Sequence, residues 1–244
     1  MMQDPNDVHA YDLSPLPPWS LGLTEDDPDL DAWSSLGVLS TVTNGDCFFH
    51  AVHLGLLSCF PHSALSTSDL RMLVAGSVFC SLRDSTVRAI LKEWRDILVQ
   101  AVITTTTVPA GSTAATVPDD AILREFRHAL PLLTDATVMD IGVLSAVYHA
   151  MVDRRRYWAD NYAVLMLQQI LGIHLIVLGE PGFVHPPTRC RPLPDDFCII
   201  LVNDSNTHYR VCVTRHHRVA AFRWRNIPRF IQRQCEARWQ KQQS

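Results

Sequence analysis

The apolar positions of residues 159–172 recur at the spacing of an α-helix. They predict one stripe that packs against a core, made of Ala163, Met166, Leu167, Ile170 and Leu171. Asp160 stands where a helix N-cap is expected, and Gly172 stands where a helix commonly ends. The apolar run 173–178 follows at once and predicts a buried strand.

Two further runs near the C-terminus predict a β-hairpin. Residues 197–202 (FCIILV) are continuously apolar, residues 203–206 (NDSN) are polar, and residues 207–213 (THYRVCV) alternate. The alternation gives the last strand an apolar face and a second face. The first holds Tyr209, Val211 and Val213, and the second holds His208, Arg210 and Cys212.

Helical patterns dominate the first half of the chain. Residues 68–82 begin with a Ser-Asp start signal and place these apolar residues on one helical face: Leu70, Leu73, Val74, Val78 and Leu82. Further helices are expected at about 85–102 and 120–133, with a surface loop at 104–118. Residues 1–32 have no period and predict an extended arm. Helices first and strands later indicate an α+β fold.

Composition places the chain among proteins with reduced thiols and no membrane span. Its seven cysteines are odd in number and scattered over 244 residues, which argues against a disulfide framework. The N-terminus lacks the basic and apolar regions of a secretory signal. The longest apolar stretch is interrupted by Gln168, Gln169 and His174 and is too short to cross a bilayer. We expect a cytoplasmic protein, or one in the host cytosol if it comes from a pathogen.

Charge is distributed unevenly along the chain. Residues 1–35 carry eight acidic residues and no Lys or Arg, whereas residues 215–244 carry eight basic residues against Glu236 alone. Either block can be a solvated surface, or a surface for an oppositely charged partner. Neither block identifies a reaction, and we expect no nucleic acid partner.

The stretch TNGDCFFHAV, residues 43–52, places Cys47 between an Asn-Gly-Asp turn and a helix-compatible apolar run. If a helix begins at Cys47, the thiol faces unpaired backbone N–H groups, which favour the thiolate. Gly45 lets the preceding loop turn sharply and bring N–H groups near a reacting carbonyl, as an oxyanion hole requires. Cys47 is therefore a candidate nucleophile, and it needs a base.

Most histidines can be set aside as that base. His50 and His53 lie one helical turn apart and could share a metal ion, but no third and fourth ligand accompanies them. We expect them at solvent-facing helix positions, and we expect no metal or other cofactor. His208 stands at the mouth of the hairpin, where a strand fixes its backbone and the ring can face a cleft. Taken alone, it could equally be an ordinary surface histidine.

Three segments together resemble the ovarian-tumour (OTU) family of cysteine deubiquitinases. NGDCFFHAV (44–52) is similar to the family's Asp-Gly-Asn-Cys-aromatic-aromatic-Arg/His-Ala block. YWADNYAVLMLQQILGIHLIVL (157–178) is similar to its Trp-centred helix and following strand, and FCIILVNDSNTHYRVCV (197–213) to its closing strand, loop and His-Tyr pair. The resemblance covers about residues 36–214, within which 83–150 would be a divergent helical insertion.

The resemblance implies a papain-like α+β domain with a small central β-sheet flanked by helices. It also implies a peptidase that cleaves after the C-terminal glycine of ubiquitin or polyubiquitin, or of ubiquitin-like modifiers, without a cofactor. Cys47 would be the nucleophile and His208 its base. The domain would span 36–214, between an acidic, proline-rich arm at 1–35 and a basic, helical segment at 215–244.

The third catalytic member is less plain. The family commonly has Asp three residues before the cysteine, or Asp or Asn two residues after the histidine. Here these positions hold Asn44 and Arg210. Asn44 could orient His208 through its amide oxygen. Asp204 and Asn206, in the loop before His208, are the alternatives.

The altered order NGDC also places Asp46 directly beside Cys47, where its charge would raise the pKa of the thiol. The leading interpretation is an active deubiquitinase. If Asn44 and Asp46 impair the site, the same cleft would bind ubiquitin without cleaving it. A viral polyprotein-processing protease of the same fold is a third interpretation.

Overall fold

The computed structural model describes residues 11–16, 29–60, 65–80, 148–149, 151–155, 157–159, 161–179, 183–187, 191–204 and 208–243. The chain forms two compact units, one made of Met1–Arg71 and Trp158–Ser244, the other of Met72–Tyr157. The first unit contains the sheet and the described residues of the predicted site. α3 (Thr67–Cys80) begins in the first unit and continues into the second.

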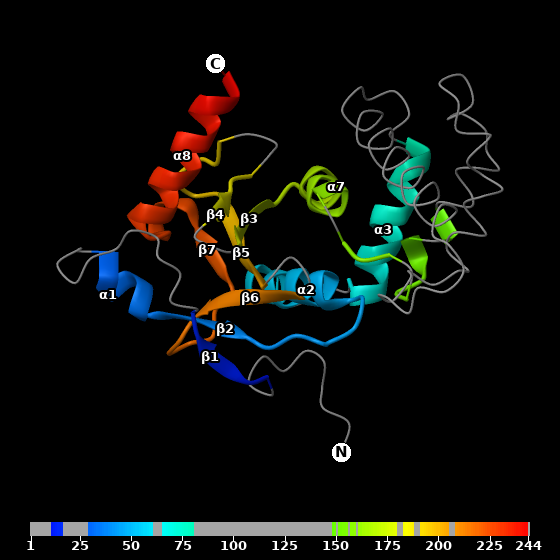
Figure 1. Cartoon of the computed structure of the whole chain (residues 1–244), viewed down its shortest axis with the longest axis horizontal. Coiled ribbons are helices and arrows are strands. Elements are labelled where there is room, and N and C mark those ends of the chain that lie inside the picture. The colour runs from blue at the N-terminus through cyan, green and yellow to red at the C-terminus, as the bar shows by residue number, and fades with distance from the viewer. Residues whose placement is uncertain are drawn as a thin grey trace, which may run out of the picture. The chain divides into compact units, whose positions relative to one another are not determined.

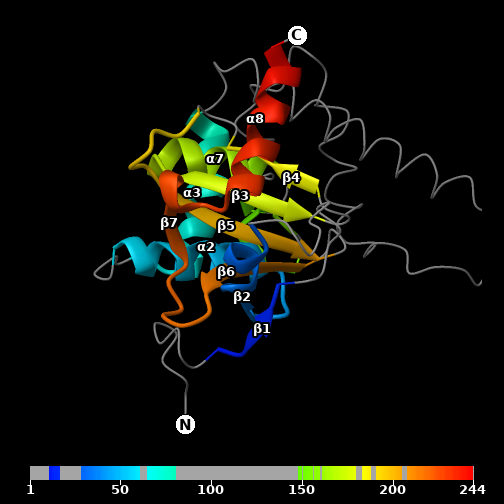
Figure 2. The same ribbon diagram turned by 90° about the vertical axis from the view of Figure 1, so that its left-hand side faces the viewer.

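Among the described residues, a mixed sheet of seven strands forms the centre of the first unit. Its strands are β1 (Leu13–Pro15), β2 (Leu36–Leu39), β3 (His174–Gly179), β4 (Phe183–His185), β5 (Phe197–Asp204), β6 (His208–Thr214) and β7 (Ala221–Arg223). Figure 2 shows them side by side in the order β1-β2-β6-β5-β3-β4 from bottom to top, and β7 pairs with β5. β3 and β5 are parallel, and the other pairs are antiparallel.

β6 changes partner along its length. Its first half pairs with β5, with His208 opposite Asp204. Its second half pairs with β2, with Thr214 opposite Leu36. Because β2 leads into the loop that precedes Cys47, this pairing joins the two segments that the sequence nominates for catalysis.

Helices cover both faces of the sheet (Figure 1). α2 (Cys47–Cys59) packs on the face of Ile199, so closely that a Cβ on Gly55 would come 2.6 Å from the Cγ2 atom of Ile199. Ile200, the next residue of β5, belongs to the opposite cluster, which includes Ile231 of α8 (Arg229–Gln243). Neighbouring strand residues point to opposite faces, so α2 and α8 lie on opposite sides of the sheet.

α7 (Asn161–Leu171) and α1 (Asp29–Ser34) contact strands of the sheet, which are β3 for α7 and β2 for α1. The last turn of α7 is tied to β3 because Gln168 Oε1 accepts the Leu175 N–H at 3.1 Å. α1 precedes β2, and Trp33 of this helix packs edge-to-face on Phe230 of α8. η4 (Trp224–Asn226) joins β7 to α8.

The main sequence predictions of the fold are confirmed. The protein is α+β, with a central sheet flanked by helices. The predicted helix within 159–172 is α7, and Gly172 ends it with a positive φ of 66°, a conformation that glycine adopts at no steric cost. The predicted hairpin is formed by β5 and β6.

Residues 1–32 were expected to be an extended arm, yet β1 and the start of α1 lie within them, and β1 pairs with β2 as an edge strand. The helices and loop predicted between 85 and 133, like the capping role of Asp160, lie outside the described residues.

No helix in the described ranges is long and apolar enough to cross a membrane. Free thiols are found at Cys47, Cys59, Cys198, Cys212 and Cys235.

Candidate active site

Cys47 is the first residue of α2, so the helix start predicted from the sequence is confirmed. Asp46 takes the N-cap position, but its side chain makes no capping hydrogen bond. Residues 47–56 of the helix are all buried, and Cys47 itself is 5% exposed. The thiol therefore stands at the start of a helix that the core holds firmly in place.

His208 reaches the same place from the far end of the chain. It is the first residue of β6 and is partly buried. The backbone N–H of the next residue, Tyr209, points to Sγ of Cys47 at 3.5 Å, and the Tyr209 ring packs edge-to-face on Phe48. The predicted nucleophile and the predicted base are therefore brought to adjoining backbone positions.

Thr41 is a polar neighbour of His208 that the sequence analysis missed. Its Oγ1 lies 3.3 Å from Nε2 of His208 and donates its hydrogen to the carbonyl of Tyr209. Because a hydroxyl has a single hydrogen, the oxygen can act towards the imidazole only as an acceptor. The contact favours the tautomer with hydrogen on Nε2, which leaves Nδ1 as the basic nitrogen.

The pKa of the Cys47 thiol is raised from its ordinary value, chiefly because burial penalises the thiolate. The backbone N–H groups of Tyr209, Phe48 and Cys47 lower this pKa, and the carboxylate of Asp46 raises it. The effects predicted for the helix start and for Asp46 are therefore both present. Burial of the thiol, which the sequence does not reveal, is the largest cause and outweighs the donors.

The pKa of His208 is lowered, again chiefly by burial. Asp204 raises this pKa and Arg210 lowers it. These two form an ion pair with each other, with Arg210 Nε 2.7 Å from Asp204 Oδ2. The shifts at Cys47 and His208 therefore act in the same sense, since each favours the uncharged form of its side chain.

The loop before Cys47 is closed upon itself. Asn44 is exposed, yet its Oδ1 accepts the Asp46 N–H at 2.9 Å and its carbonyl accepts the Cys47 N–H at 3.2 Å. The carbonyl of Gly45 accepts a hydrogen bond from Arg71. A substrate oxygen that is to bind the N–H groups of Asp46 and Cys47 must therefore replace Asn44 as their acceptor. The oxyanion role of Gly45 and Asp46 stays a prediction.

The identity of the third catalytic member also stays a prediction. The amide of Asn44 has its observed contact within its own loop. Asp204 stands opposite His208 in the hairpin, where its carboxylate is paired with Arg210. Asn206 lies outside the described residues. Thr41 is the side chain observed at hydrogen-bonding distance from the His208 ring.

His50 and His53 are buried, at 4% and 6% exposure, so their predicted solvent-facing positions are wrong. His50 Nδ1 accepts the Val42 N–H at 3.3 Å, and its Nε2 lies 3.0 Å from the hydroxyl of Tyr11. His53 bonds through Nδ1 to the carbonyl of Leu65 at 2.8 Å. The two imidazoles hold surrounding segments onto α2. In the described part of the chain, no cluster of three or more His, Cys, Asp or Glu side chains could hold a metal ion.

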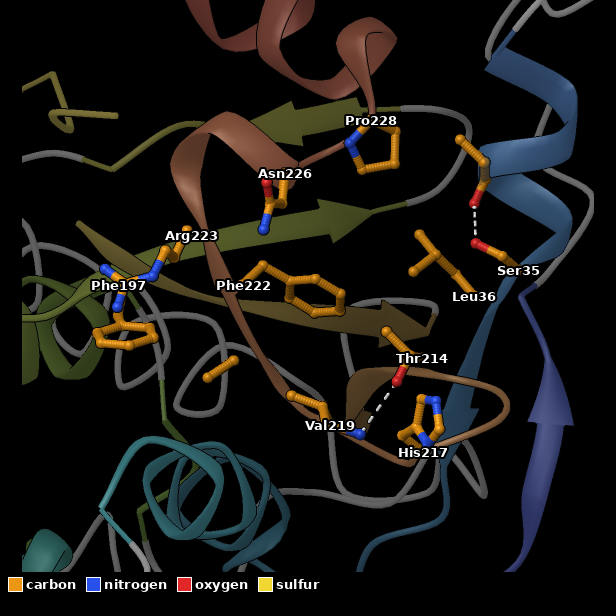
Figure 3. A pocket seen from close by; sticks show the side chains of 12 residues that line it. Ser35, Leu36, Phe197, Thr214, His217, Val219, Phe222, Arg223, Asn226 and Pro228 are labelled. Atoms are coloured by element: carbon orange, nitrogen blue, oxygen red, sulfur yellow. Dashed lines mark hydrogen bonds between the residues drawn. The ribbon is translucent and has the colours of Figure 1, made fainter. Parts of the chain in front are cut away.

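A separate pocket of about 360 Å³ lies where β2, β6 and β7 approach the turn before α8 (Figure 3). Leu36 and Phe222 form part of its apolar wall, and the Val219 N–H donates to Thr214 Oγ1 at 3.2 Å on its lower side. His217 lines it, but no cysteine does. The pocket therefore lacks the pairing of a cysteine with a histidine that the sequence predicts at Cys47 and His208.

The chain matches no family model and no curated protein sequence. The solved structures that it is similar to include OTU domains. One, an OTU domain in complex with ubiquitin, is 12% identical over 84% of this chain and 88% of that chain, with a TM-score of 0.44. An OTU deubiquitinase from Wolbachia pipientis wMel is 12% identical over 74% and 90%, with a TM-score of 0.41. The viral OTU domain protease from Farallon virus is 12% identical over 72% and 83%, with a TM-score of 0.39.

Proposed function

We propose that this protein is a cysteine-type deubiquitinase that hydrolyses isopeptide or peptide bonds at the C-terminal glycine of ubiquitin. The observation that carries the proposal is the contact of the Tyr209 N–H with Sγ of Cys47, which joins a helix-start cysteine to a strand-start histidine. The choice of ubiquitin follows from the resemblance of residues 44–52, 157–178 and 197–213 to the OTU family.

The first half of the reaction transfers the acyl group to sulfur. Nδ1 of His208 takes the thiol proton, and Sγ of Cys47 attacks the carbonyl carbon of the terminal glycine. The carbonyl oxygen becomes an oxyanion, which the N–H groups of the loop before α2 would hold in place of Asn44. Collapse of this intermediate breaks the C–N bond, and His208 gives its proton to the departing amine.

The second half releases ubiquitin. A water molecule loses a proton to His208 and attacks the thioester carbonyl. Collapse of the second intermediate breaks the C–S bond, and His208 returns its proton to Sγ, which restores the Cys47 thiol. The ubiquitin C-terminus leaves as a carboxylic acid, which ionises in water. Thr41 supports both halves because it keeps hydrogen on Nε2 of His208 and leaves Nδ1 to exchange protons.

A ubiquitin carrying a C-terminal electrophile tests the proposal directly. The full chain should form a covalent adduct, and peptide mapping should find it on Cys47. Cys47→Ala should bind ubiquitin without forming the adduct, and His208→Gln should label far more slowly. Failure of the folded wild-type chain to label would contradict the proposal, as would an adduct on another cysteine.

A ubiquitin-binding module without turnover is the second candidate. It is favoured by the raised pKa of Cys47 and by the occupation of the Asp46 and Cys47 N–H groups by Asn44. Such a module would retain ubiquitin in a binding assay, leave Cys47 unlabelled and cleave no di-ubiquitin. A polyprotein-processing protease would instead cleave peptide substrates whose sequences differ from the ubiquitin tail.

A further inference from the structure

Arg71 of α3 approaches the loop before Cys47 and binds it at two points. Its Nε donates to Oδ1 of Asp46 at 2.8 Å, and its Nη2 donates to the Gly45 carbonyl at 2.5 Å. The guanidinium also lies 4.5 Å from the ring centre of Phe49. The Arg71 side chain is 4% exposed and that of Asp46 18%, so water screens this ion pair poorly.

The first consequence concerns charge at the nucleophile. Asp46 adjoins Cys47, and its carboxylate disfavours the thiolate. Arg71 places an opposite charge in contact with that carboxylate, so the thiol faces a nearly neutral pair. Among the described residues, His208 of β6 also comes near Cys47, since it directly precedes Tyr209, whose N–H points to Sγ. Beyond His208 lie Asp204 and Arg210, which form an ion pair with each other.

The second consequence concerns the direction of a peptide group. The carbonyl of Gly45 and the N–H of Asp46 belong to one planar unit and point in opposite directions when the bond is trans. Because Arg71 holds the carbonyl, it also fixes where the Asp46 N–H points. That N–H is one of the donors that Asn44 now occupies and that an oxyanion would use.

We propose that Arg71 is a positioning residue of the Cys47 site, which neutralises Asp46 and fixes the orientation of the 45–46 peptide. Arg71 thus allows an acidic residue to precede the nucleophile without abolishing its reactivity. The effect on ubiquitin turnover rests on the proposed function, whereas the effect on the Cys47 thiol does not.

The test is the rate at which iodoacetamide alkylates Cys47 as a function of pH, followed by peptide mapping. Arg71→Met exposes the thiol to an unpaired carboxylate and should move the profile upward by about one pH unit. Asp46→Asn in the same chain removes that carboxylate and should return the profile close to wild type. Asp46→Asn alone leaves Arg71 unpaired and should move the profile downward. Arg71→Lys keeps the positive charge and should therefore keep the wild-type alkylation profile.

Arg191→Met is the matched control, because Arg191 pairs with Glu236 at an exposed position and should leave the profile unchanged. Arg71→Lys separates charge from geometry: one ammonium group cannot reproduce the two-point hold, so turnover should fall about tenfold while the alkylation profile stays. An unchanged profile in Arg71→Met, or no return in the double variant, would overturn the proposal. If Arg71→Met does not fold, Asp46→Asn alone decides the matter. An alkylation profile of Asp46→Asn that is the same as that of the wild type would then overturn the proposal.

These results separate the two proposals. Iodoacetamide needs no ubiquitin, so the alkylation profiles decide the role of Arg71 even if no variant cleaves or binds ubiquitin. Conversely, the wild-type chain could label with the ubiquitin electrophile while Arg71→Met keeps the wild-type alkylation profile. That pair of results would support the proposed function and contradict the role of Arg71.

Discussion

Oγ1 of Thr41 lies 3.3 Å from Nε2 of His208, although 167 positions separate the two residues in the chain. The contact exists because β2, which ends just before Thr41, pairs with β6, which begins at His208. The same hydroxyl donates to the Tyr209 carbonyl, so its remaining capacity towards the imidazole is that of an acceptor. One side chain therefore fixes both the position and the tautomer of the predicted base.

Thr41→Val should lower kcat by about tenfold to a hundredfold with little change in KM, because the imidazole loses the acceptor that selects its tautomer. Thr41→Ser keeps the hydroxyl and should restore most of the activity. The measurement is steady-state hydrolysis of a fluorogenic ubiquitin substrate, with the melting temperature recorded for each variant. Equal losses in Thr41→Val and Thr41→Ser would point to packing rather than to orientation of His208.

Asn44→Ala should lower kcat without unfolding the site, because the amide oxygen both holds the Asp46 N–H and is the predicted partner of His208. Asn44→Asp retains an acceptor and should keep activity or raise it. Hydrolysis by each variant is compared with that of Asp204→Ala. If Asn44→Ala keeps the wild-type kcat while Asp204→Ala loses most of it, the third catalytic member lies in the loop before His208 and is not Asn44.

Cys212→Ser should leave turnover and labelling unchanged. Cys212 is fully buried on the side of the sheet that α8 covers, and burial raises the pKa of its thiol, so it is no nucleophile. A hydroxyl placed there without a partner should lower the free energy of unfolding by about 1–3 kcal/mol. Denaturant unfolding and probe labelling together check this prediction. Lost labelling in a folded Cys212→Ser chain would contradict the assignment of Cys47.

Features set by neighbouring residues could be predicted from the sequence. The start of α2 at Cys47 follows from a turn that meets an apolar run, and the end of α7 follows from Gly172. The β5–β6 hairpin follows from one apolar and one alternating run. Each of these patterns lies within one short continuous stretch of sequence, so no knowledge of tertiary packing was required.

Features that depend on packing between distant segments were missed. Thr41 and Arg71 carry no local signal, since their partners come from other elements of the fold. His50 was expected at a solvent-facing helix position because no further metal ligands accompany it in the sequence, yet α2 is buried on almost every side. β1 has three residues and includes Pro15, too short a run to show an alternating pattern, and it forms because β2 offers an unpaired edge.

Burial of His50 makes the stability of the fold depend on pH. Its pKa is lowered to about 4, first by burial and then by the neighbouring His53, against an ordinary value of 6.5. Between these values the unfolded chain binds a proton that the folded chain does not, so stability falls as the pH drops from 6.5 towards 4. At 1.36 kcal/mol per pH unit, this residue accounts for about 2 kcal/mol between pH 7 and pH 5. The lowered pKa of His53 acts in the same direction.

His50→Gln removes the titrating group and keeps an acceptor for the Val42 N–H, so its stability should vary less between pH 7 and pH 5 than that of the wild type. The matched control is His216→Gln, an exposed histidine whose loss should leave the wild-type slope unchanged. Urea unfolding at both pH values gives the two free energies for each chain. If His50→Gln loses as much stability on acidification as the wild type, the buried imidazole is not the group that senses pH.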